Sequence, residues 1–262
     1  MKKILAIIGS PRKGETYAAV NRFIEEVNRI ESVEVEYVML NQMGFSDCSG
    51  CHNCILKGHE TCKESKRVAV LLDKMKSSDA VILASPVYNQ SVTALMKKFL
   101  DYFTYLWHRP EMFGVKFFGI SSGGGMFKGT FKLLKSNVES WGGQWMGELG
   151  MAHYESLTQK FKKKLDQEIC MKARAFVKGM NDKALPVPSF GKMMMFNIWK
   201  INAKACKDSN PADYAYWVDR GLLDKGYYYP VKINILKKTA TSLMTAIAKG
   251  FMRKVYVGYD EV

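Results

Sequence analysis

The first 180 residues alternate between short apolar runs and longer segments in which apolar residues recur at helical spacing. Each apolar run is short enough to be a buried strand, and a helical pattern follows each one. The runs predict strands at residues 3–9, 33–40, 80–85, 115–122 and 144–150. The periodic segments predict helices at residues 16–30, 65–79, 91–107, 126–142 and 157–180. This alternation is typical of an α/β fold, and we predict a doubly wound, five-stranded parallel sheet of order 2-1-3-4-5.

The pattern changes after residue 183. The segment "ALPVPSFGK" at 184–192 has two prolines and a glycine and is interpreted as a linker. We therefore divide the chain into a domain at 1–183 and a mostly helical, basic extension at 184–262. Residues 233–257 form a basic amphipathic pattern whose apolar stripe consists of Leu236, Leu243, Met244, Ile247 and Phe251. We favour packing of this stripe over a sheet edge or across a dimer; contact with an anionic membrane surface is the weaker alternative.

Composition adds a strong positive charge to this picture. The 262 residues are 47% hydrophobic and carry a formal net charge of +14. Such a balance suits polyanionic partners or simply keeps a surface soluble, and net charge alone does not predict nucleic-acid binding. The N-terminal apolar run is too short for a signal peptide, and no run is long enough to span a membrane. We expect a cytoplasmic, reducing environment, in which clustered cysteines are more often metal-binding or redox-active than structural.

The first predicted strand leads into "GSPRKGETY", which then opens a helix. Backbone N–H groups and the dipole of a helix N-terminus form an anion site. The side chains suited to a phosphate here are Ser10, Arg12, Thr16 and, with less support, Tyr17. Glu15 stands where a Walker A loop has its lysine, and the G-x-G-x-x-G fingerprint is absent. A monophosphate is therefore a better fit than ATP or a dinucleotide, and Glu15 is left out of the site.

Four segments then occur in a distinctive order: "GSPRKGET", "CSGCHNC", "ASPVYNQSVTALMKKFLDY" and "ISSGGG". Together they resemble the NAD(P)H-dependent FMN reductase and iron–sulfur flavoprotein group of the flavodoxin-like proteins, over residues 1 to about 180. The resemblance implies an FMN cofactor whose phosphate lies on the first loop, although this loop is one residue shorter than the common form. It places the flavin ring beside Pro86, Val87, Tyr88, Asn89, Ser122, Gly123, Gly124 and Gly125. These loops follow strands one, three and four, where ligands bind in open α/β sheets.

The resemblance also implies an activity. Reduced nicotinamide, NADH or NADPH, gives a hydride to FMN, which passes electrons to a quinone, a free flavin or a redox protein. No catalytic acid or base is predicted, because the four histidines are scattered and the cofactor supplies the chemistry. The alternative is an iron–sulfur or flavodoxin-type electron-transfer protein with little NAD(P)H activity. A homo-oligomer is expected in either case.

The segment after the second strand holds four of the six cysteines, Cys48, Cys51, Cys54 and Cys62, at spacing C-x2-C-x2-C-x7-C. The compact first three resemble the run that wraps a cluster in bacterial ferredoxins. A 4Fe–4S cluster on these four thiols is one interpretation, and a loop without metal has nearly equal support. Zinc fits less well, because structural zinc usually draws on separated pairs, and redox disulfide chemistry is also open.

Overall fold

The computed structural model describes residues 1–259. Its five strands form one parallel sheet of order β2-β1-β3-β4-β5, which confirms the predicted fold class and strand order. The strands are β1 (Lys2–Ile8), β2 (Val33–Met39), β3 (Ala80–Pro86), β4 (Lys116–Ser122) and β5 (Gln144–Met151). β1, β3 and β4 are almost wholly buried, as expected for strands covered on both faces.

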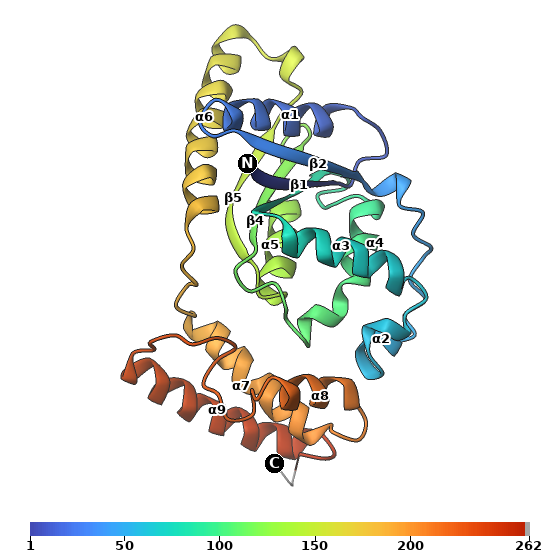
Figure 1. The fold of residues 1–262 in the computed structure, drawn as a ribbon, viewed down its shortest axis with the longest axis vertical. Coiled ribbons are helices and arrows are strands. Elements are labelled where there is room, and N and C mark those ends of the chain that lie inside the picture. The colour runs from blue at the N-terminus through green and yellow to red at the C-terminus, as the bar shows by residue number, and fades with distance from the viewer. Residues whose placement is uncertain (260–262) are drawn as a thin grey trace. The chain divides into compact units, whose positions relative to one another are not determined.

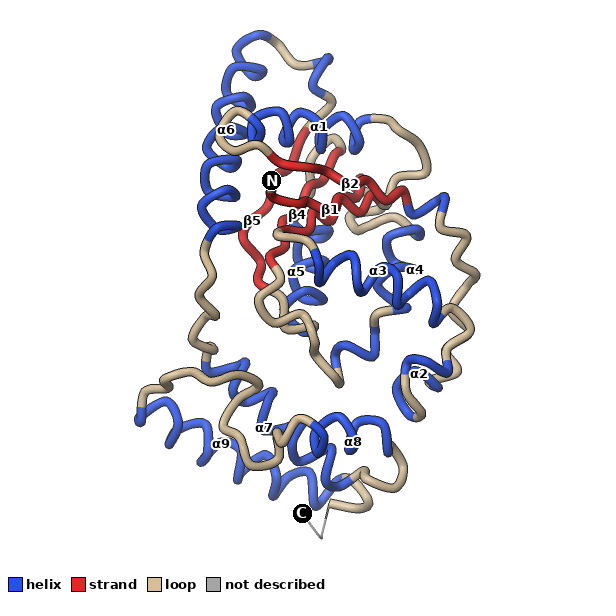
Figure 2. Tube along the Cα trace, in the orientation of Figure 1, coloured by secondary structure: helices blue, strands red, loops and turns tan. Residues whose placement is uncertain are grey.

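Five helices cover the two faces of this sheet (Figures 1 and 2). They are α1 (Glu15–Asn28), α3 (Ser65–Ser77), α4 (Ala94–Tyr102), α5 (Lys128–Ser140) and α6 (Gln159–Asn181). Helices α1 and α6 pack side by side on one face, and α3, α4 and α5 lie on the other (Figure 1). The α1 face is anchored by Phe23, which is stacked on Phe118 at 4.8 Å and meets the edge of Phe176 at 5.3 Å.

The predicted helix at 91–107 is shorter in the structure than its periodicity suggested. The side chain of Thr93 accepts a hydrogen bond from the N–H of Met96 and caps the start of α4. The helix ends at Tyr102 because Phe103 leaves the helical region, and a 3₁₀ turn (Thr104–Trp107) follows. The predicted linker is also too long at its end, since Ser189 caps a helix that already begins at Phe190.

Contacts divide the chain into two compact units. The sheet unit comprises residues 1–50 and 63–183, and the helical unit comprises residues 51–62 and 184–262. The predicted boundary at 183/184 therefore coincides with a change of unit, but the middle of the cysteine loop belongs with the C-terminal residues. The division into a domain at 1–183 and an extension at 184–262 stays a prediction.

The helical unit is built from α2 (Asn53–Leu56), α7 (Phe190–Ala205), α8 (Pro211–Asp219) and α9 (Ile235–Val255). Its core is aromatic: Phe196 lies 5.1 Å from the Trp217 ring and 4.8 Å from the Tyr228 ring. The short α2 packs against α8. Among the helices of residues 1–259, none combines the length and the apolar character needed to cross a bilayer.

Candidate functional site

The loops that follow the first, third and fourth strands surround one pocket of about 290 Å³. Nine of the twelve predicted flavin-site residues line it: Ser10, Arg12, Thr16, Pro86, Val87, Tyr88, Ser122, Gly123 and Gly124. The pocket lies where the strand order reverses between β1 and β3, at the carboxyl ends of the strands. Its lining also includes Gly14, Glu15 and His153, which the sequence analysis did not assign.

One end of the pocket is the N-terminus of α1. Gly14 is its N-cap and has no side chain to offer, and no side-chain cap bond is made there. The first-turn N–H groups of a helix have no partner within the helix, so an anion is their natural acceptor. The hydroxyls of Thr16 and Ser122 lie 2.7 Å apart in a buried hydrogen bond that ties this helix to the loop after β4. The arrangement suits a phosphate group bound by backbone N–H groups, with hydroxyls beside it.

Ser10 and Arg12 shape the loop that precedes α1. The buried Ser10 hydroxyl donates to the carbonyl of Arg12 at 2.8 Å, which closes a tight turn. Asn41 donates its amide to the carbonyl of Pro11 at 2.9 Å and holds the loop from outside. The Arg12 side chain is exposed and folds near Gly14, so its guanidinium is available at the phosphate end of the pocket.

The loop after β3 forms a small hairpin at the pocket wall. Tyr88 and Ser91 exchange two backbone hydrogen bonds, of 2.9 and 3.0 Å. Asn89 and Gln90 between them both have positive φ, 46° and 63°, the geometry of a two-residue turn. Val87 donates its N–H to the carbonyl of Ser122 at 2.8 Å, so this hairpin and the glycine loop are held together. The Tyr88 ring is half exposed beside the pocket, where it offers a flat apolar face.

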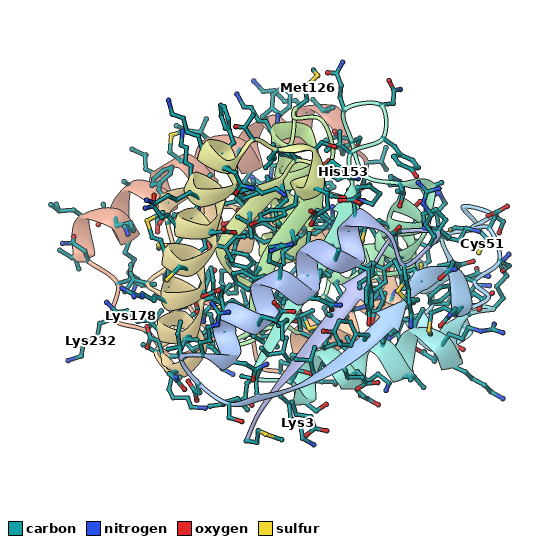
Figure 3. All side chains as sticks on the ribbon, turned by 90° about the horizontal axis from the view of Figure 1, so that it is seen from above. Lys3, Cys51, Met126, His153, Lys178 and Lys232 are labelled. Carbon is teal, nitrogen blue, oxygen red and sulfur yellow. The ribbon has the colours of Figure 1, made fainter. Side chains whose placement is uncertain are left out.

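The glycine loop after β4 provides the open side of the pocket. A Cβ at Gly124 would meet no heavy atom within 4 Å, so this stretch of backbone faces unfilled space. Gly125 has φ of +130°, a conformation that side chains disfavour. The next residue, Met126, is also left-handed and points outward with an exposed side chain (Figure 3). A planar ligand can therefore approach this backbone closely.

Three predicted residues do not line the pocket: Tyr17, Asn89 and Gly125. Tyr17 instead packs its ring 5.3 Å from Tyr37 of β2, with the Lys13 ammonium 5.3 Å from its ring centre. Asn89 occupies the turn of the hairpin, and Gly125 shapes the loop behind Gly124. Tyr17 is in the first turn of α1, and Asn89 and Gly125 are in loops that border the pocket, but the sequence does not reveal which way each residue is turned.

His153 is the pocket residue that the sequence analysis missed. It follows β5, and its Nε2 lies 3.0 Å from Oε1 of Glu15 at the N-terminal end of α1 (Figure 3). Its Nδ1 is 3.0 Å from the Ser156 hydroxyl, which fixes the ring. Its place just beyond the fifth strand was the available signal, because all parallel strands end at the same edge. Glu15 thus lies at the pocket rim with a histidine partner.

Taken together, these groups fit FMN. The uncapped helix N-terminus, the Thr16 hydroxyl and the Arg12 guanidinium are donors of the kind that a phosphomonoester requires, and the Ser10 hydroxyl closes the loop beside them. The open backbone at Gly124 and the ring of Tyr88 provide room and a flat surface for a planar heterocycle. The assignment of individual residues to FMN stays a prediction.

The cysteine segment is anchored at both ends by the sheet unit. The buried Glu64 carboxylate accepts hydrogen bonds from the hydroxyl and the N–H of Ser46 at 2.6 and 3.0 Å, and from Arg67 at 2.6 Å. These bonds, with the Ser46 hydroxyl as the main cause, lower the pKa of Glu64 to about 2. The loop is therefore closed at its base by an ionised, fully bonded carboxylate.

The four thiols differ in exposure. Cys48 and Cys51 are exposed, Cys54 and Cys62 are partly exposed, and Cys51, Cys54 and Cys62 belong to the helical unit. Within residues 1–259 no three His, Cys, Asp or Glu side chains are arranged to hold a metal ion. The four thiols suit an iron–sulfur cluster by their chemistry. The cluster stays a prediction from sequence.

Fold and pocket together define a flavodoxin-like protein with a crevice at the strand-order switch whose lining suits a phosphate group. The chain belongs to the NADPH-dependent FMN reductase family, whose sequence profile matches residues 2–141, more than half of the chain. This match confirms the resemblance drawn from the ordered loops. The matched range includes the loops after β1, β3 and β4, and it ends before His153.

Similar proteins agree with this family. An iron–sulfur flavoprotein of Archaeoglobus fulgidus is 38% identical over 113 residues, which are 43% of this chain and 50% of the relative. An FMN-dependent NADH:quinone oxidoreductase of Metamycoplasma arthritidis is 32% identical over 108 residues, 39% of this chain and 52% of the relative. The chain thus spans about half of the length of the curated relatives that it matches.

A solved structure extends the likeness in fold. An FMN-dependent NADH-azoreductase of Bacillus anthracis, in complex with FMN, superposes with a TM-score of 0.52. The superposition covers 66% of this chain and 98% of the azoreductase, at 15% sequence identity. At this identity the likeness concerns the fold alone.

Proposed function

We propose that this protein is an FMN-dependent NAD(P)H oxidoreductase that passes electrons from a reduced nicotinamide to an acceptor. The acceptor class is a quinone, a free flavin or a redox protein. When bound, FMN supplies the hydride-accepting chemistry. The chain's own residues bind the phosphate, hold the loops beside the ring and leave one side of the pocket open to a second substrate.

One observation carries the proposal: three loops far apart in sequence converge on one pocket with a phosphate end and a flat, open end. The Thr16–Ser122 hydrogen bond joins the first and third of these loops across 106 residues. The bond from Val87 to Ser122 joins the second and third. The relatives named as flavoproteins and as an FMN-dependent oxidoreductase support the same assignment.

Anaerobic stopped-flow spectroscopy of the FMN-loaded chain tests the proposal. Mixing with NADH or NADPH is expected to bleach the flavin band within seconds, and an added quinone is expected to restore it. Retention of FMN without bleaching would instead support the alternative of an electron-transfer protein. Failure to take up FMN on titration would overturn both.

A pair of threonine variants tests the site. Thr16→Val removes the buried hydroxyl but keeps the shape, and we expect the Kd for FMN to rise about ten-fold, because hydrogen bonds to charged groups contribute roughly 1.5–3 kcal/mol. Thr158→Val is the control, because Thr158 is exposed and makes no cap bond at the start of α6. Equal FMN affinity in the two variants would remove Thr16 from the site.

The cysteine loop requires a separate measurement. Anaerobic purification followed by iron, zinc and sulfide analysis distinguishes a cluster, a zinc site and a metal-free loop. The names of several relatives favour iron. The proposed oxidoreductase activity does not depend on whether the loop binds a metal, because the residues of the candidate flavin pocket all belong to the sheet unit.

A further inference from the structure

Helix α9 carries its apolar stripe on the outside. Leu236, Leu243, Ile247 and Phe251 are spaced seven, four and four residues apart, so they lie along one side of the helix. Their exposed fractions are 60 to 77%. Met244 and Val255 extend the stripe and are also exposed. Large apolar side chains that are exposed as one contiguous patch mark interaction sites in soluble proteins.

The opposite side of α9 is polar and already packed. Thr241 is the only residue of the helix that is fully buried. Thr245 accepts a hydrogen bond from the Asn197 amide of α7 at 2.9 Å and donates to the carbonyl of Thr241 at 2.6 Å. The helix is therefore docked on α7 through threonines and not through leucines. Turning its apolar stripe inward would break these bonds, so the stripe is not an incomplete part of the unit's own core.

The charge of α9 indicates the chemistry of its partner. Its 21 residues contain five basic side chains, Lys237, Lys238, Lys249, Arg253 and Lys254, and no acidic one. Arg253 and Lys254 stand at one end of the helix, where the exposed Tyr256 and Val257 follow. A partner surface with negative charges above an apolar layer would contact both the basic side chains and the apolar stripe of α9.

We propose that α9 binds an anionic lipid surface, lying parallel to it with the stripe in the headgroup–acyl boundary. Helices of this kind combine an apolar face with lysines and arginines and lie in the interface plane. A second copy of the chain is a poorer partner, because two α9 helices would bring ten positive charges together with none to oppose them. A nucleic acid would meet the charges but leave the leucines and Phe251 exposed to water. The proposal stands independently of the proposed oxidoreductase function.

Vesicle sedimentation of the full, FMN-loaded chain tests the proposal. One set of vesicles is pure phosphatidylcholine and the other contains one quarter phosphatidylglycerol. We expect at least ten-fold stronger partitioning to the anionic vesicles, falling as salt rises from 0.1 to 0.5 M because exposed charges are screened. Equal binding to both, or none to either, would overturn the proposal.

Two matched variants identify the surface. Phe251→Glu is expected to lower the bound fraction at least ten-fold. Phe161→Glu is expected to leave it unchanged, because Phe161 is similarly exposed, at 58% against 64%, but lies on α6 of the sheet unit. Lys249→Gln with Lys254→Gln is expected to weaken anionic binding about five-fold per charge while retaining the stripe. FMN retention and circular dichroism verify that each variant is folded.

Two outcomes would assign the stripe to a different partner. If Phe251→Glu converts a dimer into a monomer in light scattering while neither chain binds vesicles, the stripe is an interface between copies. If the chain binds RNA more tightly than anionic vesicles and Lys249→Gln weakens the RNA complex, the positive face serves nucleic acid. Either result would overturn the lipid assignment.

Discussion

Helices α1 and α9 have similar sequence patterns but opposite environments. Each has an apolar stripe at helical spacing, yet α1 buries Val20, Phe23 and Ile24, whereas α9 exposes Leu243, Ile247 and Phe251. The reason is their connection. α1 links two neighbouring parallel strands, so it must lie on the sheet. In contrast, α9 comes after an aromatic core that α7, α8 and Tyr227–Tyr229 have already completed.

The comparison shows what periodicity can and cannot predict. A stripe in the sequence indicates that some apolar surface covers it, but the identity of that surface depends on topology. For α1 the strand order determines that the sheet covers the stripe. For α9 no neighbouring sequence feature determines which surface covers it. The two helices also differ in which part is accessible. The N-terminal end of α1 lines the pocket, whereas one whole side of α9 is exposed.

The largest expected effect comes from truncating the buried stripe. Phe23→Ala removes a ring that stacks on Phe118 and meets the edge of Phe176, and it is expected to lower the free energy of unfolding by about 3–5 kcal/mol. Phe251→Ala is expected to change it by less than about 0.5 kcal/mol, because that ring is 64% exposed.

Urea unfolding of the FMN-loaded chain, followed by circular dichroism, measures both. Unfolding in two transitions would assign each change to its own unit. A large loss in Phe251→Ala would mean that the α9 stripe is covered in solution, which would break the contrast between the helices.

A second, smaller effect is expected at the base of the cysteine loop, where Ser46 and Arg67 are bonded to Glu64. Glu64→Gln leaves Ser46 and Arg67 without their carboxylate, and we expect a loss of about 1–3 kcal/mol at pH 7. Glu60→Gln is the control, because Glu60 is in the same loop but exposed. Urea unfolding at pH 7 measures the free energy of unfolding of the two variants and of the wild type.

The pH dependence follows from the sign of the Glu64 shift. The pKa of Glu64 is about 2 in the fold against an ordinary value of 4.5, so the unfolded chain takes up its proton first as the pH falls. The stabilisation is present above about pH 4.5 and is lost as the pH falls towards 2. The difference between wild type and Glu64→Gln is therefore expected to shrink between pH 5 and pH 3. A constant difference would show that the bonds do not depend on the charge.

Much of the fold and part of the site could be predicted from the sequence, for physical reasons. Buried parallel strands are short apolar runs, and their order fixes which loops meet, so Ser10, Tyr88 and Gly124 were placed in one crevice. The rotation of individual side chains is set by tertiary packing, and the prediction for Tyr17 was uninformative about its contact with Tyr37. His153 was missed because its role depends on a loop end with no motif of its own.

The cysteine loop shows the same limit at a larger scale. Spacing indicated which thiols are neighbours along the chain, but contacts assign residues 51–62 to the helical unit, whose structure no motif predicted. The predicted helix stripe at Leu236 to Phe251 was correct as a pattern. The expectation that it packs over a sheet edge or across a dimer stays a prediction.

The smallest expected effect concerns the end of α1, where Glu15 lies at the phosphate end of the pocket. A unit charge about 6 Å from a phosphate in water contributes roughly 0.7 kcal/mol of repulsion. Glu15→Gln is therefore expected to tighten FMN binding about three-fold at low salt, and the gain is expected to vanish near 1 M salt. Fluorescence titration of FMN measures both.

Glu25→Gln is the matched control, because it makes the same change on the same helix about 15 Å further along. It is expected to leave FMN affinity unchanged, since the dipole and the anion site act only over the first turn. The 3.0 Å contact between Glu15 Oε1 and His153 Nε2 explains what the opposite result would mean. If Glu15→Gln weakens FMN binding, the carboxylate acts by holding His153 over the helix end, and α1 contributes this contact to the pocket as well as its dipole.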